Sequence, residues 1–404
     1  MMSETPPPPA LQDRDSSGTV LSIDTGSILF LSSIFFLSYT GRSITGPLLP
    51  ALEVEVGLSH AESGGLFMFV FSGYVISLLG AGFVASFVGH RRTIILSAMG
   101  VGLGLMIAGG SHSLWSLRFG LIATGLSSGL YLPSGIAALT SLAKPAHWGR
   151  AMGIHDVAPN LSVVSAPALA AILLSWISWR GIYLGFGFLA ILLGLAFSRF
   201  GPRVPGRGQI PNTAALKSLL GESQMWIVCI LFIVATAGMI GTYNMLPLYL
   251  TSVHGFESSS ANLVVALSRV PGIGMALMAG WVTDRFGPRK AMAVILATSG
   301  VLAILIGVES ETLLIVVIFL QAAVASCFFP AGLAALSMLF PIEVRGLATA
   351  IAAVFSGLIG SGLISALLGL MADEGLFRTG IALNGIVVLA GLPSVIFLKF
   401  RRPG

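Results

Sequence analysis

Charged side chains inside apolar stretches are the residues of this chain best suited to chemistry. Arg42, Arg118 and Arg269 stand in such stretches, and Asp156, next to His155, is the acidic residue set deepest in one. A guanidinium group offers forked donors that match a carboxylate or a phosphate. A carboxyl group or an imidazole can instead accept a proton. These residues therefore indicate anion binding and, separately, proton transfer.

The apolar stretches that carry these charges have the length of membrane crossings. Of the 404 residues, 55% are hydrophobic and 9% are charged, against about 25% charged in a soluble domain. One crossing takes roughly 20 apolar helical residues, and these runs lack the alternation of barrel strands. The predicted crossings are 26–48, 63–86, 93–110, 114–142, 152–175, 180–198, 224–250, 262–283, 291–308, 312–340, 346–371 and 377–398. We predict an all-α membrane protein with twelve transmembrane helices.

The positions of lysine and arginine predict how these helices are oriented. Cationic residues gather on one side, in the tail, the loops after even-numbered crossings and the C-terminus, while the opposite loops are acidic. Sixteen of the 21 are Arg14, Arg91, Arg92, Lys144, Arg150, Arg199, Arg203, Arg207, Lys217, Arg285, Arg289, Lys290, Arg345, Lys399, Arg401 and Arg402. By the positive-inside rule, both termini are expected to be cytoplasmic, in a cell (inner) membrane. This bias also accounts for the net charge of +5, so we expect contact with the lipid bilayer and none with nucleic acid.

An internal repeat divides the chain into two similar halves. Residues 133–142 recur as 330–339 with six of ten positions identical, and residues 82–92 recur as 280–290 at nearly the same offset. Because each half holds six crossings in the same orientation, the repeat is parallel, an architecture suited to alternating access. The predicted divisions are a disordered cytoplasmic tail at 1–24, an N-terminal six-helix bundle at 25–198, a cytoplasmic linker at 199–222 and a C-terminal six-helix bundle at 223–404.

The second copy of the repeated loop resembles a known signature. Gly280, Asp284, Arg285, Gly287, Arg289 and Lys290 follow the pattern Gly-x-x-x-Asp-Arg-x-Gly-x-Arg-Arg/Lys of the major facilitator superfamily (MFS). In the first copy the glycines and the basic pair persist, but Ser86 and Phe87 replace Asp-Arg. The resemblance extends over essentially the whole chain. It implies the MFS fold of two pseudo-symmetric six-helix bundles and secondary active transport of a small-molecule solute.

Two arginines from different halves are the predicted substrate ligands. Arg42 and Arg269 fall at similar depth if each residue rises about 1.5 Å along its helix. On a shared cavity they would clamp a small organic anion, a carboxylate or phosphate ester, with Tyr243 and Asn244 supplying neutral hydrogen bonds. Tyr131, beside Pro133, either lines this cavity or packs in the core, and packing is the favoured interpretation. The alternative is that Arg42 snorkels to the headgroups and Arg269 bonds helix-end carbonyls.

Asp156, His155 and Arg118 are the candidates for proton coupling or gating. Pseudo-symmetry in such folds brings the loop of Arg285 to the start of the fifth crossing, where it can pair with Asp156. Asp156 is then the leading site for coupling to H⁺, by symport or antiport. The alternatives are stabilisation of the helix N-terminus by Asp156 and snorkelling at a helix end by Arg118.

Other classes of function are less well supported by the residues. The histidines are scattered and no nucleophile or metal-ligand motif occurs, so we expect no enzyme, no cofactor and no metal. The chain shows no pore-loop or charged-ring pattern of a channel. The runner-up is a proton-coupled exporter of hydrophobic or cationic compounds, since small residues and Pro167 in the fifth crossing resemble a motif of antiporters in the same family. A non-transporting sensor on a transporter scaffold remains an alternative, and we expect a monomer.

Overall fold

The described part of the chain is helical throughout. The computed structural model describes residues 24–144, 147–208, 213–309 and 313–400, and within these ranges it contains no β-strand. Most of the predicted tail (1–23) and part of the linker (209–212) lie outside them. The first half consists of α1 (Thr25–Ser43), α2 (Thr45–Val56), α3 (His60–Val88), α4 (His90–Gly109), α5 (Leu114–Gly129), α6 (Tyr131–Leu142), α7 (Trp148–Leu173) and α8 (Trp179–Phe200).

The second half repeats this pattern after a short helix in the linker. That helix, α9 (Thr213–Gly221), was not predicted, because its nine residues are too few to stand out as a crossing. The second half consists of α10 (Ser223–Thr236), η2 (Ala237–Gly241), α11 (Thr242–His254), α12 (Ser258–Phe286), α13 (Pro288–Val308), α14 (Leu314–Ser326), α15 (Phe328–Leu339), α16 (Ile342–Phe355), η3 (Ser356–Leu363), α17 (Ile364–Asp373), α18 (Phe377–Ala390) and η4 (Leu392–Phe397).

These helices combine into membrane crossings. Among the described residues, 11 segments are long and apolar enough to span a bilayer, and α12, bent by 41°, makes a twelfth if it is counted as one span. Each predicted crossing coincides with one of these segments, so the prediction of an all-α protein with two six-helix halves is confirmed. The observed segments extend up to eight residues beyond the predicted crossings, as Thr25–Val56 does beyond 26–48. The reason is that polar first and last turns continue the helices past the apolar runs.

Three crossings are interrupted at the same distance from a proline. α1 gives way to α2 at Ile44, α5 to α6 at Leu130, and α14 to α15 at Cys327. In each case a proline follows three residues later, and it has no N–H to donate to the carbonyl four residues before it. Two of the breaks lie at repeat-related places, so the duplication preserves the interruption as well as the span.

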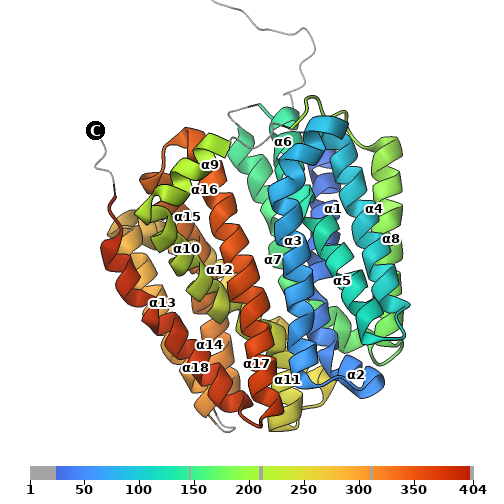
Figure 1. The fold of residues 1–404 in the computed structure, drawn as a ribbon, viewed down its shortest axis with the longest axis vertical. Helices are drawn as coiled ribbons and strands as arrows, with labels where there is room; N and C mark the ends of the chain where they lie inside the picture. The colour runs from blue at the N-terminus through green and yellow to red at the C-terminus, as the bar shows by residue number, and fades with distance from the viewer. Residues whose placement is uncertain (1–23, 145–146, 209–212, 310–312, 401–404) are drawn as a thin grey trace, which may run out of the picture.

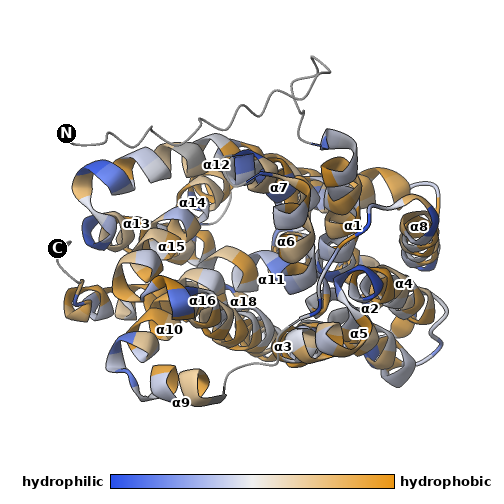
Figure 2. Cartoon of the chain, turned by 90° about the horizontal axis from the view of Figure 1, so that it is seen from above, coloured by the Kyte–Doolittle hydropathy of each residue, from blue (hydrophilic) through white to orange (hydrophobic). Residues whose placement is uncertain are grey.

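The two halves lie side by side with their helices roughly parallel (Figure 1). Within the halves α4 packs on α5 and α8, and α13 packs on α18. Between the halves α3 packs on α17, α7 on α12, and α2 on α11. Figure 2, seen along the helices, shows α7 beside α12 on one edge of this contact and α3 on the other. We call the end with the loops of Arg91, Arg199 and Arg289 the basic face, and the end with Glu55 and Asp373 the acidic face.

The repeated loops adopt the same conformation in both halves. Gly89 ends α3 with φ 83° and Gly287 ends α12 with φ 82°, a region that side-chain-bearing residues rarely adopt. Just beyond each turn an arginine bonds the last helix of its own half. Arg91 donates to the carbonyls of Phe197, Ser198 and Pro202, and Arg289 donates to that of Leu398. The first residue of the basic pair therefore ties a loop to a helix end in each half.

Arg91→Ala is predicted to destabilise the first half by about 1–3 kcal/mol, because three backbone acceptors lose a charged donor. The midpoint of thermal unfolding in detergent would measure the loss. Arg92→Ala is the matched control, since the side chain of Arg92, the next residue along the chain, is exposed. Equal midpoints for the two variants would contradict the structural role of Arg91.

Candidate functional site

Arg42 lies at the end of α1, just before the break at Ile44, and it is buried. Only 9% of its surface is exposed. Its guanidinium carbon lies 4.6 Å from the ring centre of Tyr39 and 4.1 Å from that of Tyr74 on α3. Its Nε is buried without a hydrogen-bond partner among the described residues. Contact with two π faces partly offsets the loss of hydration, but the donors of Arg42 remain free for a ligand.

Arg269 lies on α12 and is held by the second half. Its Nη2 donates to the carbonyl of Met239 at 2.8 Å, and its guanidinium carbon stands 3.7 Å from the centre of the Tyr243 ring. Tyr243 in turn donates its hydroxyl to the carbonyl of Ile318 at 2.7 Å. The Tyr243 hydroxyl is therefore committed within the protein, while its ring face positions the arginine. Arg269 keeps further donors beyond the one used on Met239.

One tyrosine lies in the neighbourhood of both arginines. Tyr39 lies against Arg42 and also interacts electrostatically with Arg269. Counted from the acidic face, Arg42 is 14 residues from the end of α2 and Arg269 is 11 from the start of α12, about 21 and 17 Å at 1.5 Å per residue. By this count the two predicted anion ligands lie at a similar depth, one on each half.

Asn244, the other predicted neutral ligand, lies next to this level on α11. Its amide donates to the Ser365 hydroxyl on α17 at 3.1 Å, and its backbone carbonyl packs against Gly46 of the first half. Because its donor is in use, Asn244 keeps its side-chain oxygen as an acceptor. In this conformation Asn244 joins the halves, and its contact with solute stays a prediction.

Tyr131 and His155 form a stacked cluster within the first half. Tyr131 is fully buried and donates its hydroxyl to the carbonyl of Leu31 at 2.7 Å. His155, 1% exposed, places Nε2 3.1 Å from the same hydroxyl and stacks on Phe35 at 4.5 Å. No surface of Tyr131 is accessible to a solute here, so its predicted part in lining the site stays untested and packing is the role that its contacts describe.

Asp156 faces outward from the helix that buries His155. Its side chain is 71% exposed, and its carboxylate stands 3.8 Å from His155 Nδ1. Within the described ranges no ion pair joins Asp156 to Arg285, the partner predicted for a closed basic face. Arg285 is exposed, 5.7 Å from the ring of Trp281.

The remaining motif residues lie at the turn from α12 to α13. Gly280 has open space where a Cβ would stand, Asp284 and Lys290 are exposed, and Gly287 makes the turn. Arg118 lies elsewhere, near the acidic end of α5, 5.2 Å from the ring of Phe69 and 4.8 Å from that of Trp115. The structure therefore keeps Arg118 apart from Asp156 and from the arginine pair.

At the acidic face the two halves are in close contact. A Cβ on Gly64 would stand 2.3 Å from the carbonyl oxygen of Ser365, and one on Gly369 would stand 2.2 Å from that of His60. Asn262 of α12 donates to the carbonyl of Pro47 at 3.0 Å. No side chain larger than hydrogen fits at these glycines without movement of the backbone, so they are needed for this approach.

A carboxylate from the second half completes the contact. Asp373, at the end of α17, accepts hydrogen bonds from the backbone N–H groups of His60 at 2.7 Å and Ala61 at 3.1 Å, in the first turn of α3. Such N–H groups have no acceptor within their own helix, and a negative charge is favourable there. Asp373 therefore acts as a cap supplied by the opposite half.

Sequence reasoning missed Tyr39, Tyr74 and Asp373. Tyr39 precedes Arg42 by three residues on one helix, a spacing that places both on the same face, so a signal for it existed. Tyr74 and Asp373 act across helix contacts that no local pattern encodes. No group of three or more His, Cys, Asp or Glu that could hold a metal occurs within the described ranges.

This geometry defines a polytopic membrane protein of two repeated helical halves with paired arginines between them. The sequence profile of the Major Facilitator Superfamily matches residues 31–278 and 258–404. The chain belongs to this family.

Relatives and solved structures show similar matches. The chain is 25% identical over 299 residues to a probable L-galactonate transporter of Escherichia coli, covering 69% of this chain and 65% of that protein. It is 22% identical over 392 residues to a gallate transporter of Pseudomonas putida, covering 87% and 85%. The aligned part thus spans about two thirds of the first of these relatives. A bacterial homologue of the human lysosomal transporter Spinster, solved in an inward-facing and occupied conformation, has the same fold with a TM-score of 0.81 at 17% identity, covering 95% of this chain and 99% of that one.

Asp373→Ala is predicted to expose the backbone amides of His60 and Ala61, which would then exchange with deuterium about tenfold faster or more, as expected for the loss of charged acceptors. Exchange measured on a peptide that spans the start of α3 would test this. Glu374→Ala, one residue further along and exposed, is the matched control. Indistinguishable exchange in the two variants would rule out the cap.

Proposed function

We propose that this protein is a secondary transporter that moves a small organic anion across a membrane by alternating access. The solute is held between Arg42 of the first half and Arg269 of the second. The observation that most supports this proposal concerns Arg42, whose guanidinium group lies against two tyrosine rings. Its Nε is buried and has no hydrogen-bond partner among the described residues. A buried guanidinium without a carboxylate is costly, and an anion that binds there offsets the cost.

The names of the relatives support this class of solute. Galactonate and gallate, and the sulfoacetate named for a relative in Cupriavidus necator that is 21% identical over 275 residues, are all organic anions. Carboxylate and sulfonate groups both accept two parallel bonds from one guanidinium. This agreement between the names and the arginine pair favours an organic anion over the hydrophobic or cationic compounds of the runner-up hypothesis.

The contacts between the halves support a conformation closed at the acidic face. The close glycines and the Asp373 cap all lie on that side of the arginine pair. Toward the basic face the second half packs little on α3, as Figure 1 shows where α16 diverges from it. We take the basic face as cytoplasmic, with both termini there, in a cell (inner) membrane, and the protein as a monomer open to the inside in this state.

Proton coupling is proposed for the pair of His155 and Asp156. Because the Tyr131 hydroxyl donates its hydrogen to Leu31, His155 Nε2 acts as the donor to the Tyr131 oxygen. Nδ1 is then the free acceptor, 3.8 Å from the exposed Asp156 carboxylate. Asp156 collects the proton and His155 receives it beside α1, the helix that carries Arg42.

Arg42→Ala and Arg269→Ala are each predicted to lower the affinity for the transported anion about tenfold or more, the loss expected for charged hydrogen bonds. Uptake into proteoliposomes, with sugar acids, aromatic carboxylates, sulfonates and lipophilic cations as a panel, would measure it. Arg92→Gln, an exposed cation of the basic face, is the control. Full uptake of an anion by both variants, or uptake of cations alone, would contradict the proposal.

His155→Gln is predicted to remove the pH dependence of uptake while anion binding persists, because glutamine cannot take up the proton that His155 Nδ1 would receive. Asp156→Asn is expected to slow the response, since it removes the exposed proton acceptor. His112→Gln, an exposed histidine of the acidic face, controls for general effects. An unchanged pH profile in both His155→Gln and Asp156→Asn would exclude this coupling route.

A further inference from the structure

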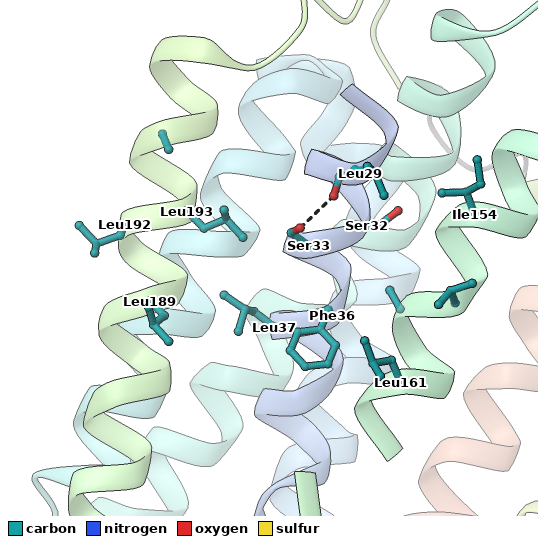
Figure 3. Close-up of a pocket in the computed structure, with 13 residues that line it drawn as sticks. Leu29, Ser32, Ser33, Phe36, Leu37, Ile154, Leu161, Leu189, Leu192 and Leu193 are labelled. Carbon is teal, nitrogen blue, oxygen red and sulfur yellow. Dashed lines mark hydrogen bonds between the residues drawn. The ribbon is translucent and has the colours of Figure 1, made fainter. Parts of the chain in front are cut away.

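A groove separate from the arginine pair runs along the outside of the first half. It has a volume of about 600 Å³ and lies between α7 and α8, with α1 as its floor (Figure 3). The side chains that surround it are apolar except for Ser32 and Ser33. Both hydroxyls bond carbonyls one turn earlier in α1, at 2.8 and 2.9 Å. The interior of the groove is therefore apolar in effect.

The groove faces outward rather than toward the second half. Leu29 on its floor is 53% exposed, and Leu161 and Leu189 on its two walls are 51% and 52% exposed. Figure 2 shows α7, α1 and α8 in sequence along one rim of the molecule. In a membrane protein this rim contacts acyl chains, so the groove opens to the hydrocarbon of the leaflet at the basic face.

On each wall of the groove an arginine follows the apolar lining residues toward the basic end of the helix. On α7 the lining residues Leu161, Val157 and Ile154 are four and three residues apart, and Arg150 comes four residues before Ile154. On α8 the lining residues Leu192 and Ala196 step forward to Arg199 at the same spacing. Residues three and four apart share a helix face, so both arginines stand at the basic end of the groove, above its apolar walls.

Neither arginine is neutralised by the protein. Both are exposed, and no ion pair to either occurs among the residues that the structure describes. Arg199 stands 5.5 Å from the ring of Phe200 and keeps its donors free. The groove therefore offers an apolar surface for an acyl chain, and one exposed arginine on each of its two walls lies at the basic end, where a lipid headgroup would lie.

We infer that this groove is a binding site for one anionic phospholipid of the basic-face leaflet. An acyl chain lies along α1 between α7 and α8, and the phosphate is held by Arg150 and Arg199. An anionic headgroup is preferred over a zwitterionic one because the site supplies cations without a compensating carboxylate. A lipid bound there packs on α7, which carries His155, and on α1, which carries Arg42. Binding of the lipid therefore affects both helices.

Native mass spectrometry of the purified protein in detergent, titrated with phosphatidylglycerol and with phosphatidylcholine of the same acyl chains, tests the site. One phosphatidylglycerol is expected to bind more tightly than phosphatidylcholine. Removing both charges in Arg150→Gln/Arg199→Gln is expected to lower this affinity by about fivefold for each arginine, down to the level of phosphatidylcholine. Arg92→Gln, another exposed cation of the basic face, is expected to leave it unchanged.

Filling the groove tests the acyl-chain half of the inference. Ser33→Phe adds a ring on the floor, and its lost hydroxyl bonds only its own helix among the described contacts. It is expected to abolish tight phosphatidylglycerol binding although both arginines remain. Ser175→Phe is the matched control, since that exposed hydroxyl also bonds only a nearby carbonyl, that of Ile172, and lies just past the acidic end of α7. Leu161→Gln, which places a polar group on an exposed wall position, serves as a second variant if Ser33→Phe does not fold.

Three results would overturn the inference. Equal affinity of the unmodified protein for the two lipids would remove the charge preference. Unchanged phosphatidylglycerol affinity in both groove variants would show that the acyl chain does not bind in the groove and that only the headgroup contacts the protein. An equal loss in Arg92→Gln and in the double arginine variant would reduce the effect to the general charge of the basic face.

Discussion

Hydrocarbon offers no hydrogen bonds, and every polar group within the crossings must find its partner in the protein or in a ligand. Most hydroxyls solve this within their own helix, as Thr124 does on the carbonyl of Gly120. Gln321 and Asn384 solve it across helices, each with a donor on the backbone of η2. Some buried polar atoms of the described residues have no hydrogen-bond partner, among them the side-chain oxygens of Gln321 and Asn384 and the Nε atoms of Arg42 and Arg118. Arg42 stands out among these because it belongs to the arginine pair proposed to hold the solute.

Comparison of the two halves shows which structural features occur in both and which occur in only one. Both halves keep a glycine with positive φ at the end of a 29-residue helix and an arginine that bonds the last helix of its half. Only the second half carries Asp-Arg at the loop, where the first has Ser86 and Phe87. The shared features are structural, since each ties a bundle together internally. The unshared charges face outward, where they are free to act in gating at the basic face.

Span positions could be predicted from sequence because burial in lipid depends on the length and polarity of one segment alone. Contacts between segments could not. The depth of Arg42 and Arg269 followed from counting residues, whereas the contact of Tyr74 on α3 with Arg42 on α1 depends on side chains that meet between two helices. The position of Tyr131 beside Pro133 left cavity lining and core packing both open, because the direction of its ring depends on its stacking with Phe35 and His155 from other helices. Asp373 looked like an ordinary exposed loop acid, and its partners are 312 and 313 residues away.

In the proposed function, the placement of the two arginines on different halves would give the anion a part in the conformational change. A ligand shifts an equilibrium only by the difference in its affinity for the two states. Arg42 moves with the first half and Arg269 with the second, so any rotation of one bundle against the other changes their separation. An anion that bridges both is bound most tightly in the conformation where the guanidinium groups converge. Close contact at the acidic face through Gly64, Gly369 and Asp373 is compatible with that convergence. In this proposal the lack of a hydrogen-bond partner for Arg42 Nε among the described residues and the bridging of the two bundles by the solute have one cause, a guanidinium group held ready for an anion.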